Sequence, residues 1–387
     1  MANYINGINP NIIKWARERS GYTLEDAAKF VKKDVTTISN WELGTQAPTY
    51  VQLETLADRY KRPVAIFFFP EPPQEPDSAD QLVLRSSEIE KLSPKVRVLL
   101  RQAYARQLSL MELNMGVNPA EQKIFRDLRA QLNDSPIELA QRTRAYLEVS
   151  VETQAGWSGV RETLENWRDR VEEKGVFVFK DAFRDEFVDG FCLIHEQFPV
   201  IYLNNSRQSV RQIFSLFHEL AHLLLGENGI THGTNPGGGE IEGFCNQFAG
   251  EFLVPSSDLE KRLSNYPVYD DDAIAELARY YKVSRPVILL KLVNLDIFTQ
   301  DDYTQRKERW AKEYEPYLEK TAEDNKMPSG GSYYNTCAVY LGYKFMELAF
   351  SKYHQGQCSI EELAEHLNDK VKNLPGLEDC LLRKATR

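Results

Sequence analysis

A pair of histidines four residues apart, with a glutamate directly after the first, constrains this chain more than any other feature. His218, Glu219 and His222 lie within residues 211–225, a stretch of strongly helical composition. Residues four apart on a helix lie on one face, about one turn apart along its axis. The two imidazoles can therefore meet a single zinc ion, and Glu219 would lie beside a water molecule on that ion.

Apolar side chains around this motif repeat at helical spacing. They stand at i, i+4, i+7 and i+11, and they are Ile213, Phe217, Leu220 and Leu224. This spacing predicts one buried face. The two histidines project from a different face, as ligands that line a cleft would. Gly226 and Gly229 are predicted to end the helix.

A second helix is predicted over residues 240–253, after a glycine-rich loop at 233–239. Its buried side carries three aromatic residues at four-residue spacing: Phe244, Phe248 and Phe252. Glu242 and Asn246 share a different face. Glu242 is predicted to be the third ligand, which leaves the fourth zinc position open for water. Asn246 would accept a hydrogen bond from the outer nitrogen of a ligand histidine. Three other side chains compete for the role of third ligand: Glu240, Cys245 and His232.

The motif H-E-L-A-H, followed by E-G-F-C-N-Q-F-A-G-E-F-L-V-P, resembles the ImmA/IrrE family of bacterial gluzincin metallopeptidases. The resemblance covers residues 156–300, and Cys245 stands where the family usually has alanine. It implies a zinc-dependent endopeptidase in which Glu219 is the general base. That glutamate would take a proton from the attacking water and pass it to the leaving amine.

Three strands are predicted upstream of the metal-binding helix, at residues 175–180, 189–195 and 199–204, because these segments are rich in β-branched and aromatic residues. An extended substrate can pair along an open sheet edge and lay its scissile bond over the metal. The strands can equally well serve only to cover the helix. The residue that stabilises the oxyanion stays open between Tyr202, His195 and Arg211.

The N-terminal segment predicts a series of short helices: one from residue 11, a second capped by Thr23, a third over 34–44 and a fourth over 50–60. The pattern L-x-x-A-A followed by I-S-x-W-E-x-G-x-x-x-P resembles the helix-turn-helix of the XRE (Cro/CI-like) family. The resemblance implies that the third helix enters the major groove of DNA. Thr36, Thr37 and Asn40 would then reach base edges, and asparagine suits adenine. The expected core is Leu24, Ala28, Ile38 and Trp41, with Glu42 as a structural contact.

The charge of this segment is weakly positive. Residues 1–70 carry nine Lys/Arg and seven Asp/Glu, so the balance is 9 − 7 = +2 in a chain of net charge −10. Phosphate contacts supply most non-specific DNA affinity, so a single copy should bind weakly. We therefore expect a homodimer on an operator in double-stranded DNA. A helix-turn-helix that is kept only for protein contacts is the alternative.

Several features favour a cytoplasmic location. No apolar stretch approaches the roughly 18 residues that span a bilayer, and the start of the chain has no signal-peptide pattern. We therefore expect no membrane contact. The five cysteines are scattered and lack C-x-x-C spacing, which favours free thiols in a reducing compartment.

The predicted fold class is α+β and mostly α, in a modular chain. The parts are an all-α helix-turn-helix domain (1–70), an acidic Pro-rich linker (71–80) and a helical domain (81–155). They are followed by a zincin-like α+β metallopeptidase domain with a small sheet (156–300) and a helical C-terminal domain (301–387). Residues 271–290 resemble a second helix-turn-helix unit, for which a plain helical support is the favoured interpretation. Helices are also predicted over 340–350 and, with a capping-box start, over 359–368.

The predicted function is that of a DNA-binding transcriptional regulator with a zinc-dependent endopeptidase site. The arrangement resembles fused XRE–ImmA/IrrE proteins of toxin–antitoxin operons, which implies an antitoxin whose partner is a toxin or protein substrate encoded nearby. The alternative is a non-enzymatic antitoxin and repressor that binds DNA and a toxin, with a vestigial or structural metal site.

Overall fold

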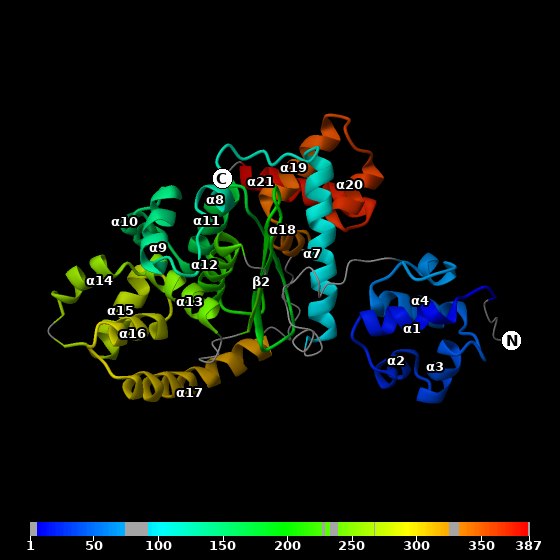
Figure 1. Cartoon of the computed structure of the whole chain (residues 1–387), viewed down its shortest axis with the longest axis horizontal. Coiled ribbons are helices and arrows are strands. Elements are labelled where there is room, and N and C mark those ends of the chain that lie inside the picture. The colour runs from blue at the N-terminus through cyan, green and yellow to red at the C-terminus, as the bar shows by residue number, and fades with distance from the viewer. Residues whose placement is uncertain are drawn as a thin grey trace. The chain divides into compact units, whose positions relative to one another are not determined.

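The structure is a computed structural model that describes residues 6–73, 92–226, 229–232, 239–266, 268–324 and 333–385 (Figure 1). The chain divides into two compact units, Met1–Ala105 with Phe183–Asp185, and Arg106–Ala182 with Glu186–Arg387. The fold class is α+β and mostly α, as predicted. Most of the predicted linker (71–80) and of the glycine-rich loop (233–239) lies outside the described residues.

Between residues 6 and 73, the first unit has four short helices followed by a 3-10 turn. They are α1 (Pro10–Arg19), α2 (Leu24–Val31), α3 (Val35–Glu42), α4 (Tyr50–Tyr60) and η1 (Val64–Phe68). Thr23 starts α2 with a capping box, and Thr49 starts α4 in the same way. These side chains satisfy backbone N–H groups that the first turn of a helix leaves without partners.

The predicted core residues Ala28, Ile38 and Trp41 are buried, and Leu24 packs against them. Glu42 makes the structural contact that its position predicted, because both of its carboxylate oxygens accept hydrogen bonds from Arg17, at 2.6 and 2.9 Å. Arg17 also donates to the carbonyl of Tyr22. This buried ion pair joins α1 to the end of α3.

Helix α7 (Pro94–Leu113) runs from the first unit into the second. Four further helices precede the sheet: α8 (Ile124–Asp127), α9 (Pro136–Tyr146), α10 (Val151–Gly156) and α11 (Val160–Glu173). Apolar residues of α8, α9 and α11 belong to the same core as the helix at residues 209–225 and the strands. These three helices therefore pack with the sheet and with that helix.

A four-stranded sheet forms the centre of the second unit, in the order β1-β3-β2-β4. Strand β1 (Phe177–Asp181) is parallel to β3 (Val200–Asn204), whereas β2 (Val188–Leu193) is antiparallel to β3 and to β4 (Gly229–His232). The first three match the predicted strands. Strand β4 was not predicted, because Gly229 was expected only to end the preceding helix.

The two faces of the sheet carry different partners. One face of the sheet packs against helix α12 (Ser209–Leu225), and it includes Val178, Cys192 and Ile201, one from each of three strands. The residues next to them on each strand point to the opposite face and include aromatic side chains. There Tyr202 stacks on Phe191 with ring centroids 5.0 Å apart, and Phe179 meets Phe345 edge-to-face. Helix α12 and the C-terminal helices thus cover opposite faces of one sheet.

Helix α13 (Glu240–Leu253) follows β4 and packs along α12. Beyond it come α14 (Ser256–Leu263), α15 (Asp271–Tyr281), α16 (Arg285–Asn294) and α17 (Gln300–Asp324). The C-terminal part contains α18 (Tyr333–Leu341), α19 (Tyr343–His354), α20 (Ile360–Leu367), η2 (Val371–Asn373) and α21 (Leu374–Ala385). The capping box predicted at Ser359 is present at the start of α20.

The single helix predicted over 340–350 was wrong. Gly342 adopts a φ of 84°, and this residue separates α18 from α19. Only glycine adopts such a conformation at low cost. The apolar spacing on both sides of Gly342 hid the break.

No described helix combines the length and apolar character that a bilayer span requires.

Candidate functional site

Helices α12 and α13 supply the side chains of the predicted metal centre. The residues of α12 from Ile213 to Leu224 are buried almost throughout, so the helix runs through the interior of the unit. It ends at Gly226, which adopts the left-handed conformation typical of a helix terminus. His218 and His222 are 1% and 2% exposed, so neither imidazole is an ordinary surface histidine.

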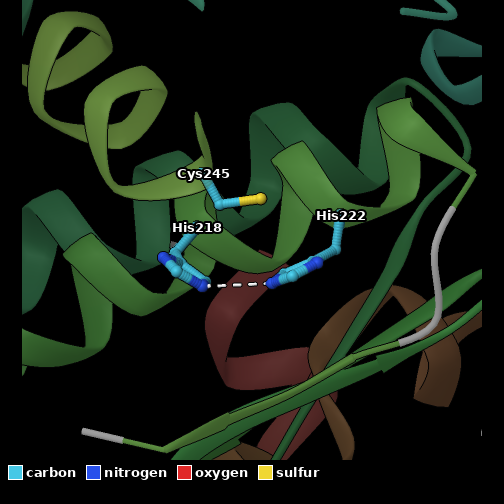
Figure 2. Close-up of side chains that lie close together, drawn as sticks. All are labelled: His218, His222 and Cys245. Atoms are coloured by element: carbon cyan, nitrogen blue, oxygen red, sulfur yellow. Dashed lines mark hydrogen bonds between the residues drawn. The ribbon is translucent and has the colours of Figure 1, made fainter. Parts of the chain in front are cut away.

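The predicted ligands of the two helices converge. The Nε2 atoms of His218 and His222 lie 3.1 Å apart, and Figure 2 shows the two rings directed toward each other. The Glu242 carboxylate approaches both rings, with Oε2 3.2 Å from His218 Nε2 and Oε1 3.2 Å from His222 Nε2.

These spacings fit a zinc ion. Zinc–nitrogen and zinc–oxygen bonds of about 2.0–2.2 Å give donor–donor separations of about 3.4 Å in a tetrahedron. The three observed separations, 3.1, 3.2 and 3.2 Å, are close to this value. Two neutral imidazoles and one carboxylate are also ligands that zinc prefers. The donor set and its spacing therefore suit this ion.

The competing third ligands differ in their placement. Glu240 is exposed at the first residue of α13. The side chain of His232 lies outside the described residues. Cys245 is fully buried, and one ligand atom from each of His218, His222 and Cys245 lies within 4.8 Å of the others. Glu242 and Cys245 thus both border the site.

Electrostatics within the cluster follow from burial and close contact. Burial would raise the pKa of Glu242, but hydrogen bonds with the two imidazoles hold it well below its usual range. Burial lowers the pKa of His218 and so favours its neutral, metal-binding form. Burial also raises the pKa of the Cys245 thiol, against the opposing effect of its contact with His222.

Asn246 lies where the sequence placed it, beside the outer nitrogen of a ligand histidine. Its Oδ1 is 3.1 Å from His218 Nδ1. An amide oxygen at this position accepts a hydrogen bond from Nδ1–H, which leaves the Nε2 lone pair free to face the cluster. The contact therefore selects the tautomer that metal binding needs.

Glu219 is fully buried and lies against the backbone of β2. A Cβ added at Gly190 would lie 3.3 Å from Glu219 Oε1 and 3.0 Å from the carbonyl oxygen of Tyr202. Gly190 therefore leaves room for the glutamate. Sequence reasoning missed this residue, although a glycine inside a strand pattern is a recognised sign of close approach.

An ion-pair cluster next to Gly190 joins β2 to the start of α12. Asp189, which is buried, accepts from Arg207 at 2.6 Å and from Arg211 Nε at 3.0 Å. Arg211, one of the proposed oxyanion residues, is thus held by a carboxylate. The sequence did not predict this pairing.

The other two oxyanion candidates lie away from the ligand cluster. Tyr202 belongs to the aromatic row on the sheet face opposite α12. His195 accepts hydrogen bonds at Nδ1 from the backbone of Gln197 and Phe198, and it lines a separate cavity of about 390 Å³. The contacts of Tyr202 and of His195 therefore do not direct either side chain toward His218 or His222.

In the first unit, the predicted base-contacting residues lie on α3. Thr36 is exposed, whereas Thr37 and Asn40 are half-buried. The Thr37 hydroxyl donates to Asp34 at 2.8 Å, so it also takes part in capping the helix. The backbone carbonyl of Asn40 accepts from Thr45.

Comparisons with known proteins agree with both parts of this structure. Residues 13–67 match the family model for a helix-turn-helix, and residues 171–293 match the model for an IrrE N-terminal-like domain. No curated protein sequence matched the chain. The first matched segment is thus similar to the helix-turn-helix of XRE-type DNA-binding regulators, and the second is similar to ImmA/IrrE-type domains of metallopeptidases. The chain therefore joins two segments of these kinds.

Proposed function

We propose that this protein is a transcriptional regulator with a zinc-dependent endopeptidase site, acting as the antitoxin-type component of a toxin–antitoxin operon. The observation that carries the enzymatic part is the convergence of His218, His222 and Glu242 from two helices, at separations of 3.1–3.2 Å. The match to an IrrE-like domain supports it. The antitoxin role rests on the resemblance to fused regulators of such operons.

In this proposal, His218, His222 and Glu242 hold a zinc ion, which supplies Lewis-acid activation of water and of a peptide carbonyl. Glu219 takes up the proton that the attacking water loses and delivers it to the leaving amine. The backbone at Gly190 supports Glu219 from behind, and Asn246 fixes the ring of His218. These residues keep the reacting groups oriented in a buried site.

The substrate would be an extended segment of a partner protein. Strand β4 stands at one end of the described sheet order and directly precedes α13. A peptide strand can pair with such an edge through backbone hydrogen bonds. The edge therefore offers a way to hold a chain beside the cluster.

The enzymatic proposal is tested on the purified full-length chain and the product of the neighbouring gene. Metal analysis should find one zinc per chain, and His222→Ala should lose it. Glu219→Gln should keep the zinc but abolish cleavage of the partner, because the proton acceptor is gone. The matched control is Glu240→Gln, which changes an exposed carboxylate on α13 and should leave both properties intact. Folded wild-type protein without metal would refute the proposal.

A non-enzymatic antitoxin is the second candidate, and the burial of a thiol beside the ligands favours it, because four protein ligands would leave no position for water. Co-expression with the neighbouring toxin separates the two. If Glu219→Gln neutralises toxicity and represses the operon as well as wild type does, proteolysis plays no part in that role.

For DNA binding, we propose that Thr36, Thr37 and Asn40 contact base edges of an operator, with the protein bound as a homodimer. A gel-shift with the upstream region should show weaker binding by Asn40→Ala, by about 1–3 kcal/mol if its amide pairs with adenine. Thr55→Ala on α4 is the control, because its hydroxyl donates within its own helix to Val51. Unchanged affinity in both Asn40→Ala and Thr36→Ala would contradict this assignment.

A further inference from the structure

We propose that Cys245 is a fourth protein ligand of the metal centre, so that the resting site is closed by two imidazoles, a carboxylate and a thiolate. This inference rests on the zinc site of the proposed function. It adds a residue that the predicted His-His-Glu set leaves out, and it changes the expected resting state from open to closed.

The position of Cys245 on α13 brings it to the cluster. It follows Glu242 by three residues, so the two side chains share a helix face. Its side chain is fully buried, and its Sγ lies within 4.8 Å of ligand nitrogens on His218 and His222. Figure 2 shows the sulfur of Cys245 beside the two rings, near the dashed line that joins them.

A small movement would bring the sulfur into the coordination sphere. With zinc–sulfur and zinc–nitrogen bonds of about 2.3 and 2.0–2.1 Å, sulfur and nitrogen ligands stand about 3.5 Å apart in a tetrahedron. The 4.8 Å limit therefore requires an approach of at most about 1.3 Å. On binding, the S–H bond breaks, a zinc–sulfur bond forms and the proton passes to solvent.

The chemistry of the site changes with the fourth ligand. Zinc sites with four protein ligands are structural, whereas catalytic sites keep one position for water or substrate. A thiolate in that position would exclude the attacking water, so Cys245 would have to leave the metal before hydrolysis could begin. Cys245→Ala should consequently open the site, which lowers metal affinity but raises any peptide cleavage.

Cobalt substitution in the full-length protein tests the ligand set directly. A thiolate ligand gives a ligand-to-cobalt charge-transfer band in the near ultraviolet, which imidazole and carboxylate ligands do not give. Wild-type protein should bind one cobalt and show the band. Cys245→Ala should bind one cobalt without it. Cys192→Ala, which removes another buried thiol from the same core, should retain it.

X-ray absorption of the wild-type zinc protein requires no variant and gives a second readout. A sulfur shell at about 2.3 Å is expected beside the nitrogen and oxygen shell at about 2.0–2.2 Å. Full metal loading with no sulfur shell and no charge-transfer band would overturn the role of Cys245 and leave the three-ligand site standing. Folded wild-type protein that binds neither metal would overturn the proposed zinc site as well.

Discussion

Asn246 contacts the imidazole of His218, one of the proposed metal ligands, and should hold that ring in its orientation. Its Oδ1 lies 3.1 Å from His218 Nδ1. Removing such a partner typically costs 10–100-fold in metal affinity. We expect Asn246→Ala to weaken zinc binding by about this factor in competition with a chelator. Asn246→Asp keeps an acceptor oxygen and should retain most of the affinity. Equal affinity in wild type and Asn246→Ala would show that the ring is held by packing alone.

Gly190 is the second residue on which the site depends, because its missing Cβ makes room for Glu219. Gly190→Ala should destabilise the protein by about 1–3 kcal/mol through overpacking and should displace the glutamate. Gly250→Ala is the matched control in α13, where an added Cβ meets nothing within 4 Å. It should instead stabilise the helix by about 0.5–1 kcal/mol. Denaturant titrations measure the change in the free energy of unfolding, which should fall in Gly190→Ala and rise in Gly250→Ala. Destabilisation of equal size in both variants would contradict the contact at Gly190.

At the scale of elements, one kind of helix end recurs four times in the described part of the chain. Helices α2, α4, α15 and α20 each end in a left-handed residue: Lys32, Lys61, Lys282 and Asn368. In each case the next backbone N–H bonds five residues back, to the carbonyl of Ala28, Ala57, Ala278 or Ala364, at 2.9–3.0 Å. The cases at α4 and α20 were not foreseen from the sequence. Turn geometry alone does not assign a DNA-binding role to α15–α16 or α20–α21.

The left-handed residues at these helix ends predict how much a glycine substitution should stabilise the protein at each position. Lysine pays a steric cost in the left-handed region that glycine avoids, while asparagine tolerates this region better. Lys282→Gly should therefore stabilise its unit by up to about 1 kcal/mol, and Asn368→Gly by less. Chemical denaturation followed by circular dichroism measures both, with Lys282→Ala as the control that should gain nothing. A larger gain at Asn368 would contradict the argument.

Elements with local signals were predictable from the sequence. Helix α4 was predicted at its observed bounds, and the capping box of Thr49 and Gln52 that the structure shows is a local signal for its start. Strand β4 was missed because it has four residues and depends on backbone pairing with the distant β2. Helical spacing likewise predicted that His218 and His222 share one face of a helix, whereas the third ligand stayed open between Glu242 and its competitors. The approach of Gly190 to Glu219 joins a strand to a helix, so no local pattern contains it.

On the scale of the whole molecule, a buried pair of charged side chains in the second unit joins helix α11 to the C-terminal helices. Arg168 donates to the carbonyl of Val339 in α18 at 2.8 Å. Its guanidinium also occupies the space where a Cβ at Gly342 would lie. The carboxylate of Glu172 lies 3.4 Å from Arg168 Nε and accepts from Val178 N in β1. Arg168 therefore contacts the C-terminal helices at the break between α18 and α19.

This junction should make stability depend on pH. Burial raises the pKa of Glu172 to about 7, from an ordinary value of 4.5, and Arg168 offsets only part of that effect. The folded state then binds this proton more tightly than the unfolded state does. The resulting stability is fully present below about pH 4.5 and is lost as the pH rises through about 7.

A shift of this size corresponds to roughly 3 kcal/mol. We expect Glu172→Gln, which keeps the shape and an acceptor for Val178, to remove this contribution to the pH dependence. Denaturant titrations of wild type and variant at pH 5 and pH 8 measure the difference in slope. Arg170→Gln, an exposed change on the same helix, should leave the slope unchanged. If Glu172→Gln also left it unchanged, Glu172 would be ionised at both pH values, and its pairing with Arg168 would outweigh burial.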